Sequence, residues 1–433
     1  MNKSAEKGLV PELRFPEFNN DAKWKQKNLG KLSTIVRGGS PRPIDNFMTL
    51  DKLGLNWLKI GDVDKSAKYI SMTKERVTID ALSKTREVHP GDLIMSNSMS
   101  FGRPYIMQIK ACIHDGWIAV TEIKDYIDLN YLYYFILSEK PQFYFLNAAA
   151  GGGIKNLNAE IIKSLSVVYP VSKNEQQKIG DCLSSLDELV NAHNQKLDAL
   201  KAHKKGLMQQ LFPAESETVP KLRFPEFRGD GDWCFDDLGS KAKKVGSGIT
   251  PRGGDKNYKS AGVPFVRSQN IGWGSLLLDN IAYIEEEVHQ SFSGTEIKES
   301  DVLLNITGAS IGRTAIADQR VTGGNVNQHV CIIRTKLKEL HPVYLSQFIL
   351  SPNGQLQIDS FQAGGNREGL NFAQIRSFSI PIPPNVEEQK KIADGLSSID
   401  ELITAQSQKI DALKTHKQGL MQQLFPVVNE VSV

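Results

Sequence analysis

A duplicated segment constrains this 433-residue chain more than any other feature. The stretch KIGDCLSSLDELVNAHNQKLDALKAHKKGLMQQLFP at residues 178–213 returns at residues 391–426, identical at 26 of 36 aligned positions without a gap. A second pair marks the beginning of each half, because LRFPEF occurs at residues 13–18 and again at 222–227. The sequence between these markers differs between the halves. A repeated frame with two different inserts predicts one scaffold that carries two different specificities.

The repeated segment has the apolar spacing of a coiled-coil helix. Apolar residues recur in alternating steps of four and three, which is typical of a helix that packs along another helix. They are Ile179, Leu183, Leu186, Val190, Leu197, Leu200, Leu207 and Leu211, then Ile392, Leu396, Ile399, Ile403, Ile410, Leu413, Leu420 and Leu424. Polar residues fill the remaining positions: His193 and Lys204, then Gln406 and Lys417. We expect an antiparallel pair in which His193 and Gln406 fix the register; a long core helix is the alternative.

Both helices have start and stop signals. Ser172 precedes Glu175 by three residues, and Asn385 precedes Glu388 by three, which fits capping boxes at the two helix starts. A proline then closes each repeat. Helices of about 38 residues would be roughly 55 Å long, enough to hold two globular domains apart.

The two inserts are predicted to fold as similar globular domains. Short β-rich runs alternate with Gly, Pro and Asn turns in both. These runs are Ser33–Arg37, Trp57–Ile60, Leu93–Ser96, Trp117–Glu122, Pro264–Arg267, Val302–Ile306 and His329–Arg334. The fold class is therefore α/β, in a mixed α+β form, with an internal pseudo-two-fold repeat. The expected order is an N-terminal segment (1–18), domain one (19–170), helix one (171–213), a linker with the repeat start (214–227), domain two (228–384), helix two (385–426) and a tail (427–433).

Composition limits the possible classes of protein. The net charge is only +3, so a nucleic-acid surface would have to be a local patch. The four cysteines show no metal-ligand spacing or disulfide pattern. No signal peptide and no membrane span of about 20 apolar residues is present, which predicts a cytoplasmic protein without a membrane partner.

Taken together, these motifs resemble one known family. The doubled LRFPEF, the loops SPR and TPR, the Gly-rich turns before SLSVVYP and SFSIPIP, and the doubled helix ending in QQLFP are similar to the specificity subunit of type I restriction-modification enzymes. The resemblance implies two target recognition domains that bind the halves of a split, asymmetric sequence in double-stranded DNA. It also implies two methyltransferase and two restriction subunits as partners, with S-adenosylmethionine, ATP and Mg expected in those partners and no cofactor in this chain.

Motifs for catalysis are missing from the sequence. No Asn-Pro-Pro-aromatic segment of an adenine methyltransferase occurs, and no GxxxxGK[ST] loop for ATP. The histidines have no zinc-ligand spacing such as HExxH. We therefore expect the chain to be non-catalytic by itself and to bind no metal. A structural adaptor with two protein-binding domains remains the alternative function.

Polar residues in and beside the predicted loops are the candidate DNA contacts. They are Arg42, Lys59, Asp62, Arg103 and Lys155 in the first half, and Arg252, Arg267, Gln269, Asn270, Arg313, Asn327, Gln328 and Arg367 in the second. Arg267, Gln269 and Asn270 follow an apolar strand and supply the donors and acceptors that base edges require. The Gly-rich segments at 151–158 and 364–371 are either phosphate contacts or tight turns that dock each domain on its helix.

Overall fold

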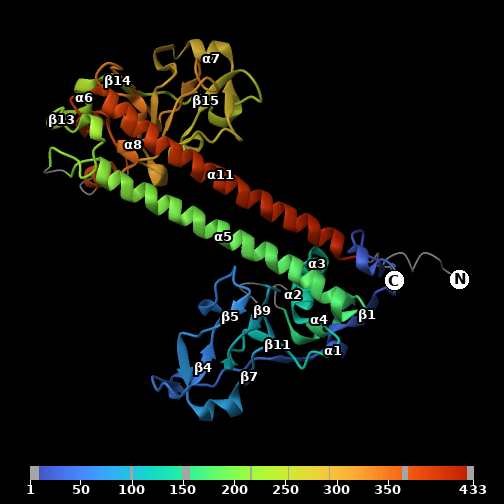
Figure 1. The fold of residues 1–433 in the computed structure, drawn as a ribbon. Coiled ribbons are helices and arrows are strands. Elements are labelled where there is room, and N and C mark those ends of the chain that lie inside the picture. The colour runs from blue at the N-terminus through green and yellow to red at the C-terminus, as the bar shows by residue number, and fades with distance from the viewer. Residues whose placement is uncertain are drawn as a thin grey trace. The chain divides into compact units, whose positions relative to one another are not determined.

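The computed structural model describes residues 9–97, 101–148, 157–214, 217–251, 253–291, 293–362 and 369–426. The chain forms two compact units. Unit 1 comprises Met1–His193 and Lys409–Val433, and unit 2 comprises Asn194–Gln408. Each unit therefore contains one globular insert, one half of each long helix and one copy of the LRFPEF segment; the inserts and the two long helices are drawn in Figure 1. None of the helices in the described ranges has the length and apolar character that a membrane span requires.

The insert of unit 1 is built on two five-stranded sheets. Its strands are β1 (Lys25–Asn28), β2 (Thr34–Arg37), β3 (Met48–Thr49), β4 (Leu55–Leu58), β5 (Tyr69–Ile70), β6 (Glu75–Val77), β7 (Arg86–Val88), β8 (Leu93–Ser96), β9 (Pro104–Met107), β10 (Ala111–Ile113), β11 (Trp117–Thr121) and β12 (Ser166–Tyr169). One sheet has the order β2-β11-β8-β9-β5 and the other β3-β6-β4-β10-β7, while β1 pairs with β12. Both faces of β8 and β9 are buried, which suits their mainly apolar sequences.

Short helices connect these strands to the long helix of the first repeat. They are α1 (Leu29–Leu32), α2 (Leu129–Leu137), α3 (Glu139–Ala148) and α4 (Ala159–Ser164), followed by α5 (Lys173–Leu211). Asp128 caps the start of α2, because its Oδ1 accepts a hydrogen bond from the Tyr131 amide at 2.9 Å. Six of the nine residues of α2 are buried, so this helix is part of the core.

The insert of unit 2 repeats this plan with fewer strands. They are β13 (Cys234–Asp237), β14 (Ala242–Ser247), β15 (Val263–Val266), β16 (Ala282–Ile284), β17 (Val302–Asn305), β18 (Thr314–Ile316), β19 (Asn325–Val326), β20 (Val330–Thr335) and β21 (Ser379–Ile382). The helices are α6 (Leu238–Lys241), α7 (Glu286–Gln290), α8 (Pro342–Leu350), α9 (Pro352–Gln362), α10 (Phe372–Arg376) and α11 (Val386–Leu424). The sheet orders are β14-β20-β17-β18 and β16-β15-β19. The mixed α/β class and the predicted strands are confirmed.

In each unit the LRFPEF motif docks on the start of the long helix. Arg14 binds both carboxylate oxygens of Glu175 at 2.7 Å, and Arg223 binds those of Glu388 at 2.8 and 2.9 Å. All four side chains are at most 8% exposed. A buried bidentate pair needs both partners, because either charge alone would be costly to bury.

This pairing corrects the predicted capping boxes. Ser172 does cap α5, since its Oγ accepts a hydrogen bond from the Glu175 amide at 3.4 Å. The carboxylate of Glu175, however, binds Arg14 and the Trp24 indole instead of closing back on its own helix start. Glu388 likewise binds Arg223. The spacing correctly predicts the helix starts, but each glutamate binds an arginine of the LRFPEF segment.

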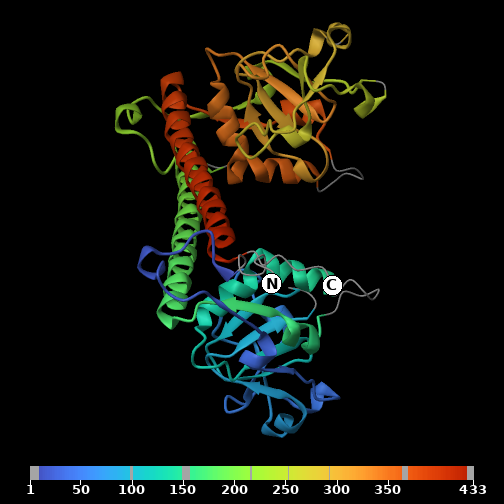
Figure 2. The same ribbon diagram turned by 90° about the vertical axis from the view of Figure 1, so that its right-hand side faces the viewer.

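The far end of the opposite helix packs on each insert. In unit 1, Phe425 contacts Tyr131 and Phe135 of α2 edge-on, with ring centroids 5.6 and 5.8 Å apart. Phe212 makes the equivalent contacts in unit 2, with Tyr344 and Phe348 of α8, both at 5.4 Å. Figure 2 shows α11 (red) beside α5 (green), and the packing inside each unit is antiparallel.

The lysines of the coiled-coil pattern form ion pairs inside each unit. Lys417 of α11 binds Asp187 of α5 in unit 1, and Lys204 of α5 binds Asp400 of α11 in unit 2. The polar interruptions are therefore matched by acids on the facing helix half. The role of His193 and Gln406 in fixing register stays a prediction.

Candidate nucleic-acid interface

Three segments of the unit 1 insert meet where β4 and β10 end, in the sheet with the order β3-β6-β4-β10-β7. They are the loop after β2, the residue after β4, and the turn between β10 and β11. The parallel pairing of β10 with β4 brings the last two together, and the His114 amide donates to the Leu58 carbonyl at 3.1 Å. We call this place the loop cluster of unit 1; it is lined by Ser40, Arg42, Lys59, His114 and Asp115.

A hydroxyl group joins the first and third segments of the loop cluster. Ser40 Oγ donates to Asp115 Oδ1 at 3.0 Å and accepts from the Asp115 amide at 3.2 Å. Arg42 lies in the same loop, and its Nη2 is 3.7 Å from Asp115 Oδ2. Its side chain is 83% exposed, so the guanidinium is available to an anion. The cluster surrounds a hollow of about 380 Å³ that also contains Trp57 and Glu75.

Lys59 and Asp62 are held by neighbours within the insert. Lys59 Nζ donates to Glu75 Oε1 at 2.6 Å, and this hydrogen bond raises the pKa of Lys59. Asp62 accepts from the Lys59 amide at 3.3 Å and is 7% exposed, so its carboxylate caps the short 3-10 helix Ile60–Asp62. Asp62 thus stabilises the loop, and its contact with DNA stays a prediction.

The unit 2 insert has the same loop cluster with different side chains. The Asn327 amide donates to the Val266 carbonyl at 3.0 Å, as β19 pairs in parallel with β15. Thr250 Oγ1 donates to Gln328 Oε1, the counterpart of the bond from Ser40 to Asp115. Two predicted residues, Arg267 and Gln328, thereby gather with Thr250, which the prediction did not include.

Arg267 and Asn270 are more constrained than the sequence indicated. Arg267 Nη2 donates to the Asn280 carbonyl at 2.9 Å, and its guanidinium lies 4.8 Å from the centre of the Tyr258 ring. Asn270 is 1% exposed; its Oδ1 accepts from the Arg267 amide and its Nδ2 donates to Leu277. Asn270 therefore caps the helix Ser268–Asn270 as Asp62 caps its counterpart, and it cannot offer these atoms to a base. Gln269 beside it is exposed.

Three other predicted residues lie away from the loop clusters or have an internal role. Arg103 donates to the Ser66 carbonyl at 3.1 Å and lines a hollow near α2 and α5. Arg313 stacks over Trp273, which lines a hollow beside the long helices. Asn327 is 7% exposed and accepts from the His329 amide, so it shapes the turn before β20.

Lys155, Arg252 and Arg367 lie outside the described residues. So do the glycines of the two Gly-rich segments, except for Gly369. Their proposed phosphate or base contacts therefore remain predictions.

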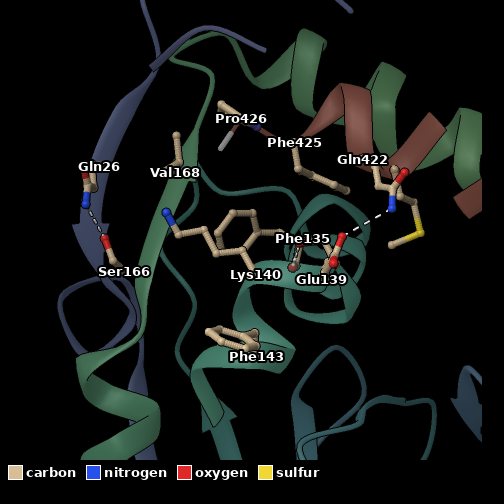
Figure 3. A pocket seen from close by; sticks show the side chains of 12 residues that line it. Gln26, Phe135, Glu139, Lys140, Phe143, Ser166, Val168, Gln422, Phe425 and Pro426 are labelled. Atoms are coloured by element: carbon tan, nitrogen blue, oxygen red, sulfur yellow. Dashed lines mark hydrogen bonds between the residues drawn. The ribbon is translucent and has the colours of Figure 1, made fainter. Parts of the chain in front are cut away.

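A third hollow in unit 1 has a different chemistry from that of the loop cluster. It measures about 490 Å³ and lies where the end of α11 packs on α2 and β12 (Figure 3). Figure 3 shows Phe425 over Phe135, with Gln422 donating to Glu139 and Gln26 donating to Ser166 across the strands β1 and β12. Lys140 is the one cation in its lining. Mostly apolar walls at a packing junction do not suit a nucleic-acid backbone.

The family model for the type I restriction modification DNA specificity domain matches the chain twice, at residues 21–202 and 237–415. Each match covers one insert and most of the long helix that follows it. The chain belongs to this family. Its two specificity domains are the two inserts described above, each with its helix.

Individual relatives match the chain over nearly its full length. The putative type I restriction enzyme MjaX specificity subunit of Methanocaldococcus jannaschii is 24% identical, with 98% of this chain and 95% of the relative aligned. The MjaVIII specificity subunit of the same organism is 20% identical, with 95% and 93% aligned.

Solved structures share the fold of these specificity domains. The crystal structure of a type I restriction-modification S subunit from M. genitalium has a TM-score of 0.59 at 14% identity and covers 97% of this chain and all of its own. A structure from a study of complex assembly and conformational transition in the type I R-M system gives 0.58 at 16% identity, covering 94% of this chain and 98% of its own.

Sequence reasoning missed Ser40, His114 and Asp115 in the first specificity domain. A signal was present, because a hydroxyl residue precedes Pro-Arg in both halves, as Ser40 and Thr250. Its partner could not be read from the sequence, since Ser40 and Asp115 lie 75 positions apart.

Proposed function

We propose that this chain recognises a split, asymmetric sequence in double-stranded DNA as the specificity subunit of a type I restriction-modification complex. The observation that carries the proposal is the pair of loop clusters. Two inserts with one fold bring the same positions together, and these positions hold Ser40, Lys59 and Asp115 in one insert but Thr250, Arg267 and Gln328 in the other. Equal scaffolds with unequal polar groups suit two different half-sites.

The proposed DNA contacts are the exposed members of the loop clusters and their neighbours. Arg42 offers the most exposed cation described at its cluster and suits a phosphate or guanine. Gln269 and Gln328 are exposed in unit 2. Lys59 and Arg267 would contribute charge from positions already fixed by Glu75 and Asn280. Arg252, Lys155 and Arg367 are proposed on sequence alone.

Partners follow from the proposed role. Two methyltransferase subunits and two restriction subunits would supply catalysis, with S-adenosylmethionine, ATP and Mg bound in those subunits. The chain itself would contribute recognition only and would act in the cytoplasm, where chromosomal DNA is accessible. Resemblance to the family supports this assignment; the number of partner subunits is part of the proposal.

The proposal is tested by the methylome of cells that carry this chain with its methyltransferase. We expect one methylated motif made of two different half-sites with an unspecified gap between them. A continuous palindrome, or no new motif with a methyltransferase known to be active, would contradict it. Arg42→Gln should weaken the first half-site alone.

A protein-binding adaptor is the second candidate. The net charge of +3 is low for a DNA-binding chain. In addition, Leu50 and Leu53 in the turn between β3 and β4 are apolar residues that are 102% and 90% exposed. Binding to random duplexes separates the two functions, because association with DNA weakens steeply as salt rises from about 50 to 200 mM. An adaptor would show no binding at either salt concentration.

A further inference from the structure

Asp115 and Gln328 occupy the same position in the two inserts. Each is the second residue after the strand that pairs in parallel with β4 or β15. The residue before each one donates its amide to the last residue of that neighbouring strand, at 3.1 Å in unit 1 and 3.0 Å in unit 2. The register of two independent copies therefore places Asp115 and Gln328 at equivalent points of their loop clusters.

Two glycines fix the hydroxyl group that contacts each of these side chains. A Cβ on Gly38 would lie 2.2 Å from the His114 carbonyl oxygen, and one on Gly248 would lie 1.6 Å from that of Val326. The loop thus crosses directly against the turn in both inserts, which only glycine permits. Two residues later, Ser40 or Thr250 donates its hydroxyl hydrogen to Asp115 or Gln328.

The two equivalent side chains have opposite hydrogen-bonding capacity. An ionised aspartate accepts hydrogen bonds and donates none. Asp115 Oδ1 accepts from Ser40, and Oδ2 remains an acceptor whose nearest cation, Arg42, is 3.7 Å away and 83% exposed. Gln328 accepts from Thr250 through Oε1, which leaves its Nε2 as a pair of donors on an exposed side chain.

The cations in the loop clusters do not cancel this difference. Lys59 is paired with Glu75 at 2.6 Å, and Arg267 is held by the Asn280 carbonyl and the Tyr258 ring. His114 Nδ1 lies 3.0 Å from Asp115 Oδ1, but this nitrogen accepts a hydrogen bond from the Gly116 amide at 2.9 Å, and Asp115 Oδ2 is left to other partners. An exposed contact between Arg42 and Asp115 at 3.7 Å is weak, and water or a base can replace it. Asp115 therefore keeps an acceptor toward the hollow of about 380 Å³ that it lines.

We propose that Asp115 and Gln328 determine base preference at corresponding positions of the two half-sites. Asp115 favours a base that presents an amino group, cytosine N4 or adenine N6. A glutamine with both ends free pairs with adenine N6 and N7. Because Thr250 already donates to Oε1, Gln328 presents Nε2 and favours a base with acceptors, guanine O6 and N7 or thymine O4. This inference rests on the proposed DNA-recognition function and assigns the residues that make the two halves of the target differ.

Exchanging the pairs between the inserts tests the assignment. Asp115→Gln with Ser40→Thr installs the unit 2 pair in unit 1, and Gln328→Asp with Thr250→Ser does the reverse. The readout is the methylome of cells that carry each variant of the full chain with its methyltransferase. We expect the first variant to change the preferred base at one position of the first half-site by about 5- to 150-fold and to leave the second half-site unchanged.

Matched controls separate the possible failures. Asp80→Asn removes an exposed acid of the same insert that does not line this hollow and should leave the motif as it is. An unchanged motif in both exchange variants, or equal weakening at every position, would overturn the assignment while the split target stands. If the methylome obtained with the wild-type chain shows no split target, the proposed function itself is wrong. If the Asp115 variant fails to fold, the Gln328 variant decides the question in the other insert.

Discussion

Units 1 and 2 are nearly identical where the insert meets the long helices and different where the loops cluster. At the helix start, Gln176 accepts from the Asp128 amide at 2.8 Å, and Gln389 accepts from the His341 amide at the same distance. At the loop clusters, unit 1 has an acid, Asp115, at the position where unit 2 has an amide, Gln328. Contacts at the helix start are buried and bonded on both sides, so a change there costs stability. Loop side chains are exposed and can change without that cost.

Three equivalent positions near the long helices differ between the two units in their residue or its hydrogen bonds. The Trp24 indole donates to Glu175 at 3.1 Å, whereas the buried Trp233 Nε1 has no hydrogen-bond partner in the described structure. Tyr134 of unit 1 is replaced by Gln347 in unit 2, and the helix-capping Asp128 by His341. Each pair offers one substitution whose effect should differ between units.

The largest difference is expected at the buried ion pairs. Arg223→Ala leaves Glu388, 1% exposed, without its guanidinium and should lower the free energy of unfolding of unit 2 by about 3–5 kcal/mol. Arg14→Ala should cost about 1 kcal/mol less, because Glu175 keeps the hydrogen bond from Trp24. Denaturant unfolding of the full chain gives the magnitudes, and hydrogen exchange in α2 and α8 assigns each loss to its unit.

A surface arginine provides the control for that experiment. Arg320 is 63% exposed and pairs with Asp318 two residues away, so Arg320→Ala should change stability by no more than about 0.5 kcal/mol. If both variants, Arg14→Ala and Arg223→Ala, lose the same free energy of unfolding, Trp24 does not stabilise the Glu175 carboxylate. The two buried ion pairs would then be energetically equivalent.

A smaller difference is expected between Asp187 and Asp400. Asp187 accepts from Tyr134 Oη at 2.7 Å and pairs with Lys417. Burial lowers the pKa of Lys68, and Asp187 is the strongest charge that opposes this shift. Asp187→Asn thus removes the partner of Lys417 and the strongest of the acidic charges acting on Lys68, and should cost about 2 kcal/mol. Asp400→Asn removes the partner of one lysine, Lys204, and should cost about 1 kcal/mol.

The pH dependence of the Asp187→Asn variant provides a second readout. A lysine whose pKa is lowered on folding binds fewer protons in the folded unit than in the unfolded chain. The penalty at Lys68 is therefore complete below its folded pKa and is relieved as the pH rises toward 10.5. Stability of the variant should recover over this range more than that of Asp400→Asn. A larger loss for Asp400→Asn at neutral pH would reject the two-lysine explanation.

The sequence predicted the repeated parts of the fold well because they depend on local rules. The helices begin at Lys173 and Val386, directly after the predicted caps, and the buried strand Leu93–Ser96 has the predicted bounds. Apolar periodicity and capping residues act within a few positions of the chain, so they can be read without a structure.

The candidate site was only partly predictable, because polar side chains have several uses. The run Ser-Gln-Asn after β15 was interpreted as a set of base contacts, yet Asn270 caps its own loop, as Asp62 does. Asx residues compete for nearby backbone amides, and the sequence does not say which use prevails. Contacts between distant segments, such as Arg14 with Glu175 and Ser40 with Asp115, could not be predicted from the sequence either.

The smallest expected difference lies at the N-cap residues that directly precede α2 and α8. Asp128 caps α2, whereas His341 makes no side-chain cap and its buried Nδ1 has no hydrogen-bond partner in the described structure. Burial lowers the pKa of His341 below 6.5, so the unfolded chain takes up a proton before folded unit 2 does. Stability of unit 2 should therefore fall as the pH drops through 6.5. His341→Asn should add a cap of about 0.5–1 kcal/mol and remove this fall, measured as slower hydrogen exchange in α8 at pH 7 and pH 5.5. Exchange in α2 serves as the internal reference, and an α8 whose protection still drops between these two values in the variant would assign the acid sensitivity to groups other than His341.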